Sequence, residues 1–157
     1  MAAPSPCIVL FILALVVPGI SAGRCNMTGT WWNVLGSTFY LSEAENSSLR
    51  GRYQTAVEAA AGEAGPDGLA PVIGIRHSGR DPTFSMSTMW AGGSITSWVG
   101  QCLMQEDGNQ VLKTMWLLRS PVASLEEDWK STRVGQDTFY RIAKDVLSKD
   151  ELQSLKP

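Results

Sequence analysis

The sequence predicts an all-β protein, an eight-stranded antiparallel up-and-down β-barrel. Strand-like segments recur about every ten to fifteen residues, while helix signals are scarce. Short turn signals such as Gly92-Gly93 and Asp107-Gly108 separate these segments, and Asp-Gly supplies the positive backbone angles of a tight hairpin. The third observation is that one face of the strands gathers both tryptophans and polar groups.

The expected strands, in chain order, are 28–34, 37–41, 49–57, 70–77, 83–91, 94–104, 110–119 and 131–142. Residues 58–68 are the longest predicted loop, because Ala, Gly, Pro and acidic residues there show no alternation. This loop is either a lid or a tolerated surface loop. A second loop carries Pro121, an acidic run and, at its end, Trp129.

A two-sheet sandwich is the alternative fold, and the content of the inward faces favours the barrel. One parity class joins Asn33, Tyr53, Thr55, Ser94, Thr96 and Asp137 with Trp31, Trp90, Trp98, Trp116 and Leu118. A dry core does not favour so many polar groups, whereas a ligand pocket does. The strand 110–119 is apolar on both faces, so it either lies between two layers or has a pocket on one face and a subunit contact on the other; we favour the second interpretation.

Residues 1–22 are expected to be a secretory signal peptide, since they hold a long apolar run followed by small residues. A membrane anchor is the alternative, but Pro18 interrupts the run. Removing 22 of 157 residues leaves one domain, 23–142, and a charged tail, 143–157. The protein is therefore predicted to be extracellular.

Two cysteines remain after the signal peptide, and an even pair in an oxidising compartment predicts a disulfide between Cys25 and Cys102. Two free buried thiols are the alternative. Asn26 and Asn46 begin sequons, which makes them candidate glycosylation sites. The formal net charge of −2, without a basic patch, argues against nucleic acid as a partner.

Several separated motifs in order resemble the avidin family. They are TGTWWNVLGS at 28–37, GRYQTAV at 51–57, the pattern of Ser94, Thr96, Trp98 and 100–102, LKTMWLLR at 112–119, DWK at 128–130 and TRVG at 132–135. The resemblance covers the chain from residue 23 to about 139. It implies a homotetramer that binds biotin tightly and without covalent bonds at the open end of the barrel.

The resemblance also implies a role for each site residue. Asn33, Ser37 and Tyr53 would donate to the ureido oxygen, Thr55 and Asp137 would accept from the ureido N–H groups, and Thr96 would face the sulfur. Trp90, Trp98, Trp116, Leu35 and Leu118 would enclose the rings. Val57, Ala59, Ala60 and Ser94 would lie near the carboxylate, and a neighbouring subunit would receive Trp129.

Two departures from the family pattern fall at the carboxylate end. Glu58 follows Val57, and an acidic side chain near the ligand carboxylate is unfavourable. The Gly92-Gly93 link is one residue shorter than the family's. Weaker affinity or faster release of biotin is therefore expected.

Two other function classes compete with the biotin-binding tetramer. A lipocalin-like secreted barrel for another small hydrophobic ligand leaves the polar ring of the pocket unexplained. A secreted hydrolase lacks catalytic groups, because Gly92-Gly93-Ser94 has no partner base and His77, the single histidine, has no second ligand or base. No enzyme activity, metal, cofactor or membrane partner is therefore predicted.

Overall fold

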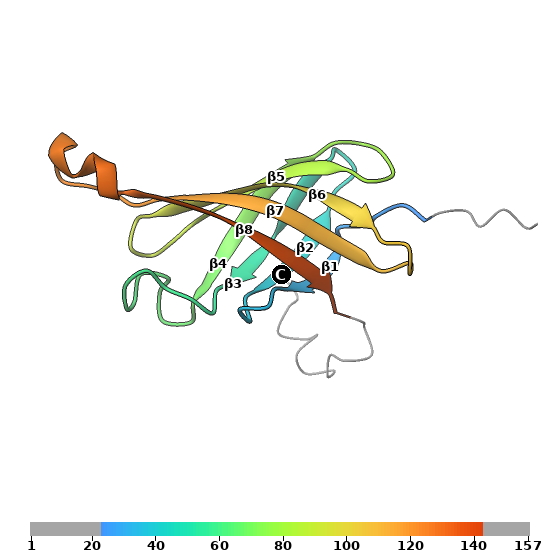
Figure 1. Cartoon of the computed structure of the whole chain (residues 1–157), viewed down its shortest axis with the longest axis horizontal. Coiled ribbons are helices and arrows are strands. Elements are labelled where there is room, and N and C mark those ends of the chain that lie inside the picture. Colours follow the sequence, from blue (N-terminus) through green and yellow to red (C-terminus); the bar gives the residue numbers. More distant parts are fainter. Residues whose placement is uncertain (1–22, 143–157) are drawn as a thin grey trace, which may run out of the picture.

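The computed structural model describes residues 23–142, which form a closed barrel in which each strand pairs antiparallel with the next and β1 pairs with β8 (Figure 1). The strands are β1 (Gly29–Trp32), β2 (Thr38–Glu43), β3 (Ser48–Gln54), β4 (Leu69–Arg76), β5 (Thr83–Met89), β6 (Ile95–Met104), β7 (Gln110–Arg119) and β8 (Thr132–Arg141). The predicted signal peptide and tail lie outside the described residues. The predicted barrel is confirmed, and the sandwich is wrong because the sheet closes on itself.

Every predicted strand is present, and the differences lie at the ends. The first strand stops at Trp32 because Asn33 and Ser37 already form a tight loop, in which the Asn33 N–H donates to the Ser37 carbonyl (3.0 Å). The third stops at Gln54, and Thr55 begins the connection to β4. A short 3₁₀ helix, η1 (Leu125–Lys130), was not predicted and lies in the β7–β8 connection.

An aromatic cluster fills the middle of the barrel. Phe39 on β2 lies 4.4 Å from Tyr53, 5.0 Å from Trp98 and 4.7 Å from Phe139 between ring centroids. Alternation points these side chains inward from four different strands. The cluster therefore separates a packed half of the barrel from an open half.

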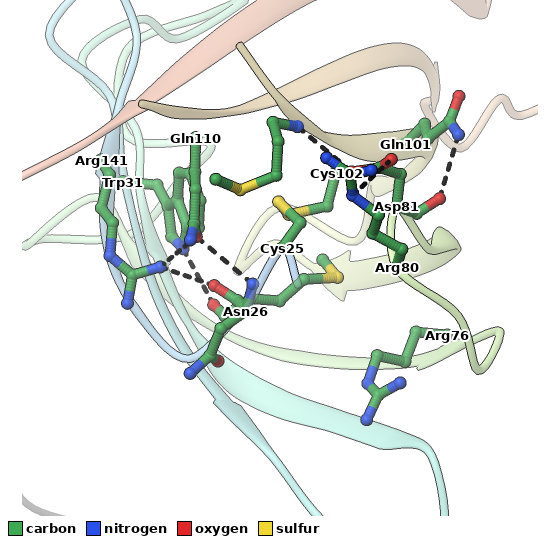
Figure 2. Close-up of a disulfide and its surroundings, with 12 residues drawn as sticks. Cys25, Asn26, Trp31, Arg76, Arg80, Asp81, Gln101, Cys102, Gln110 and Arg141 are labelled. Atoms are coloured by element: carbon green, nitrogen blue, oxygen red, sulfur yellow. Dashed lines mark hydrogen bonds and ion pairs between the residues drawn. A yellow bond between two sulfur atoms is a disulfide. The ribbon is translucent and has the colours of Figure 1, made fainter. Parts of the chain in front are cut away.

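The packed end is closed by the segment before β1 (Figure 2). Cys25 forms a disulfide with Cys102 on β6, and the two Cα atoms are 5.9 Å apart. The indole of Trp31 donates to the Met27 carbonyl (2.9 Å), and Arg141 lies over the Trp31 ring at 5.1 Å. The predicted pairing is confirmed, and Cys25 precedes the first strand in the structure as it does in the prediction.

Several large apolar side chains point out of the barrel. Met115, Leu117 and Val134, on β7 and β8, are 65%, 46% and 68% exposed. Ile73, Ile75, Met89 and Val99 are also exposed on β4, β5 and β6. Both faces of β7 are thus apolar, as the sequence indicated. Within residues 23–142, no helix is long and apolar enough to span a membrane.

Candidate ligand-binding site

A cavity of about 220 Å³ opens at the end of the barrel opposite the disulfide. Fourteen of the sixteen predicted site residues line it: Asn33, Leu35, Ser37, Tyr53, Thr55, Val57, Ala59, Trp90, Ser94, Thr96, Trp98, Trp116, Leu118 and Asp137. They come from seven strands or their ends, and a closed sheet brings their inward faces together. Their contact with a ligand stays a prediction.

Three hydrogen-bond donors are held at the inner end of this cavity. The Asn33 side-chain oxygen accepts from the Leu35 and Ser37 N–H groups (3.1 and 2.8 Å), so its NH₂ group faces Asp137 and the cavity. The Ser37 hydroxyl accepts from the Ala56 N–H (3.0 Å), so its own O–H acts as a donor. Burial raises the pKa of Tyr53 to about 12, so its hydroxyl stays protonated and can donate.

These three donors suit one strongly polarised oxygen. Asn33 and Ser37 are buried at 1% and 2% exposure, and each has its acceptor side occupied by backbone N–H groups. The donors are therefore oriented before any ligand arrives, which avoids an ordering cost on binding.

Asp137 supplies an acceptor beside these donors. Its carboxylate accepts from the Asn33 NH₂ group (3.2 Å). Burial raises the pKa of Asp137, and hydrogen bonds from Asn33 and Trp116 oppose that rise without cancelling it. The inner end thus offers donors for an oxygen and an acceptor for an adjacent N–H group.

Thr55 and Thr96 each present a hydroxyl in the lining of the cavity. The Thr55 hydroxyl accepts from the Val57 N–H (3.1 Å) and donates to the Val57 carbonyl (2.6 Å). The Thr96 hydroxyl accepts from the Trp90 indole (2.8 Å). Each oxygen keeps part of its bonding capacity for a ligand.

Tryptophan side chains form the apolar walls. The Trp98 side chain lines the cavity, and its indole N–H is buried without an acceptor among the described residues. Trp116 lies against Gly135 on the next strand, where an added Cβ would come within 2.4 Å of the ring. Only glycine at this place lets the ring lie flat against β8.

The β3–β4 connection, residues 55–68, forms one side of the cavity mouth and is called the mouth loop below. The Gly92 N–H on the β5–β6 link donates to the Glu63 carbonyl in this loop (2.9 Å), and Ala64 is buried against the core cluster. The loop is therefore docked on its neighbours, and Val57 and Ala59 line the cavity from it.

Two predicted site residues lie elsewhere. Ala60 belongs to the mouth loop but does not line the cavity. Trp129 is 84% exposed in η1, which extends past the barrel at the same end as the mouth loop (Figure 1). A salt bridge between Arg119 and Asp128 holds η1 to the end of β7. Trp129 thus takes no part in its own chain's cavity.

Four cavity-lining residues were not predicted as ligand contacts: Glu58, Glu63, Ala64 and Arg133. Arg133 has the inward parity of Gly135 and Asp137, so strand alternation could have found it. The other three lie in the mouth loop, where no periodicity indicates which side chains face inward.

Comparison with known proteins places this architecture among relatives. The avidin family profile matches residues 21–142. Avidin-related protein 4/5 of Gallus gallus is 44% identical over 144 residues, which cover 88% of this chain and 93% of that protein. The crystal structure of xenavidin matches with a TM-score of 0.71 and 38% identity, covering 76% of this chain and 99% of that one.

The structure of the biotin binding protein from chicken matches with a TM-score of 0.70 and 34% identity, covering 76% of this chain and 98% of that one. The family profile and these relatives span nearly the whole described barrel, including the strands that line the cavity. The chain belongs to the avidin family.

Proposed function

We propose that this protein is a secreted, non-catalytic binder of biotin, and that the cavity at the open end of the barrel holds one biotin per chain. The observation that carries this proposal is the convergence of Asn33, Ser37 and Tyr53 donors beside the Asp137 acceptor. A ureido group presents one polarised oxygen and adjacent N–H groups, which matches that set. The chicken relative named for biotin binding adds support from the comparisons.

The apolar walls suit the rest of the molecule. Trp90, Trp98 and Trp116 surround the space above the donors, and burying a fused ring system between aromatic side chains contributes most of the expected affinity. The ligand's chain then leaves toward the exposed mouth loop, because the inner end is closed by Phe39 and Phe139.

The working form of the protein is a homotetramer in which Trp129 of one chain covers the cavity of another. The exposed apolar residues Met115, Leu117 and Val134 support a subunit contact, since monomers seldom expose such a patch. Trp129 is 84% exposed at the mouth end and leaves its own cavity unfilled, which supports its insertion into the cavity of a neighbouring chain. Tight binding would then require the assembled protein.

Secretion follows from residues 1–22 and agrees with the disulfide between Cys25 and Cys102. Asn26 and Asn46 both lie exposed on the surface, so both sequons are accessible to glycosylation. No nucleic acid or membrane partner is proposed.

The test is isothermal titration of the secreted protein with biotin, together with its mass in solution. One tight site per chain on a tetramer is the expected result. A folded tetramer that gives no heat with biotin would contradict the function and would favour another small ligand in the same cavity. A tight site on a monomer would contradict only the assembly.

A further inference from the structure

The cavity has a charge that disfavours an anionic ligand. Its lining holds three carboxylates, Glu58, Glu63 and Asp137, and one guanidinium, Arg133, which give a formal charge of −2. Asp137 has a task at the inner end, where it accepts hydrogen bonds. The two glutamates belong to the mouth loop, where the free end of a bound biotin would lie.

Glu58 already fills the place where the mouth loop could hold an anion. One of its carboxylate oxygens accepts from the Gly62 N–H (2.9 Å), and the other accepts from the Ala64 N–H (3.1 Å). Converging backbone N–H groups of this kind form anion sites. Here the protein's own carboxylate occupies them, so they are not available to a ligand carboxylate.

Glu63 adds a second negative charge beside it. Among residues 23–142 its carboxylate has no hydrogen-bond or ion-pair partner, although its backbone carbonyl anchors the loop to Gly92. Arg133 projects from β8, beside Leu118, and is exposed. A single exposed guanidinium cannot neutralise both glutamates.

Resting on the proposed function, we propose that this cavity selects biotin in neutral amide linkage, as when it is attached to a protein lysine, over free biotin. The free acid brings a third carboxylate to the mouth and is repelled by Glu58 and Glu63. The amide brings no charge, and its N–H can donate to a glutamate oxygen, which has further lone pairs to accept it. The preferred ligand class is therefore a biotin conjugate.

The experiment compares free biotin with its N-methylamide in competition titrations of the secreted protein at neutral pH. The amide is expected to bind roughly tenfold more tightly, since one unbalanced like charge at a cavity mouth has about that effect. In Glu58→Gln and, separately, Glu63→Gln, the acid should gain affinity while the amide changes little. High salt should reduce the difference for the unaltered protein.

Glu106→Gln is the matched control, because Glu106 lies in the β6–β7 hairpin at the opposite end of the barrel from the β5–β6 link. It removes the same charge and should leave the ratio of the two affinities unchanged. Glu63→Gln controls for distortion of the mouth loop, because the Glu63 carboxylate has no hydrogen bond within the described part of the chain that the substitution could break.

Acid binding that equals or exceeds amide binding would overturn the inference and leave biotin binding intact. An unchanged ratio in both Glu58→Gln and Glu63→Gln would overturn it as well. Failure of both probes to bind would instead overturn the proposed function, and the preference with it.

Discussion

At the scale of single residues, burial controls the protonation state of two groups in the site. Asp137 and Tyr53 both have raised pKa values, and burial is the first cause of each. For the acid this makes the ionised acceptor costly to keep. For the phenol it keeps the neutral donor in place across the physiological range.

Asp137 is expected to make biotin release depend on pH. As the pH falls through its raised pKa, the carboxylate gains a proton and loses much of its value as an acceptor, so release should quicken on acidification. Asp137→Ala should quicken release strongly at neutral pH and flatten this pH dependence. The rate of displacement of labelled biotin measures both effects, and unchanged release in the variant would remove Asp137 from the site.

The raised pKa of Asp137 also affects the stability of the unliganded protein. The folded state binds this proton more tightly than the unfolded chain, so ionised Asp137 lowers stability above its folded pKa. That cost disappears once the pH falls below the pKa of Asp137 in the unfolded chain. Asp137→Asn should therefore raise the melting temperature at pH 7 and give no gain in strong acid. A gain that grows on acidification would show that the sign is wrong.

Tyr53→Phe tests the donor set. The variant keeps the ring packed on Phe39 and Trp98, whose centroids lie 4.4 and 4.8 Å away, and removes only the hydroxyl. A lost hydrogen bond to a strongly polarised oxygen costs about 1.5 to 3 kcal/mol, so affinity should fall roughly tenfold to a hundredfold. Titration with biotin measures the fall, and the melting temperature should change little.

At the scale of elements, strand pairing positions the cavity walls. Trp116 on β7 faces Gly135 on β8, and their register puts the indole over the glycine. The mouth loop and the β5–β6 link are joined by one backbone hydrogen bond, from Gly92 to Glu63. Wall and mouth therefore rest on contacts between different elements.

Gly135→Ala should disturb the β7 wall. An added Cβ would lie 2.4 Å from the Trp116 ring, so the indole must shift into the cavity. Overpacking of this kind costs about 1 to 3 kcal/mol of stability, and biotin affinity should fall with it. Denaturant unfolding and titration measure the two losses. Gly23→Ala is the control, since its nearest neighbour is 4.0 Å from the added atom.

At the scale of the whole molecule, the barrel separates a closed end from an open end that holds the cavity. The disulfide joins residues 77 apart at the closed end. The mouth loop and η1 lie at the other end (Figure 1). The cavity opens there as well. Stability and binding can therefore be altered separately.

The double variant Cys25→Ser and Cys102→Ser should lose about 4 kcal/mol of unfolding free energy, because the disulfide closes a long loop in the unfolded chain. Denaturant titration measures the loss. Biotin stoichiometry should stay at one per chain, because no cysteine lines the cavity. An unchanged unfolding midpoint would show that the disulfide adds no stability.

Trp129→Lys tests exchange between subunits. It should quicken biotin release and weaken the tetramer, although the chain's own cavity is intact. Leu125→Lys is the matched control, because Leu125 lies in the same η1 helix and is 88% exposed. Release kinetics and mass in solution are the measurements. An effect on neither would exclude Trp129 from both roles.

The sequence by itself determined the barrel, the strands in order and the inward residues from Asn33 to Asp137. Alternation along a strand is local, so it can be read without knowing the fold. The sequence also indicated the Cys25–Cys102 pairing, since the two cysteines that follow the predicted signal peptide permit a single disulfide.

Only the tertiary structure decided what happens at the cavity mouth. Side chains in a loop follow no regular alternation. The sequence could therefore indicate that Glu58 is unfavourable near a ligand carboxylate, but it could not show that the Glu58 carboxylate accepts from the N–H groups of Gly62 and Ala64. Glu63 and Arg133 come to the same opening from segments far apart in the chain. Their shared position depends on closure of the sheet, which is a property of the whole barrel.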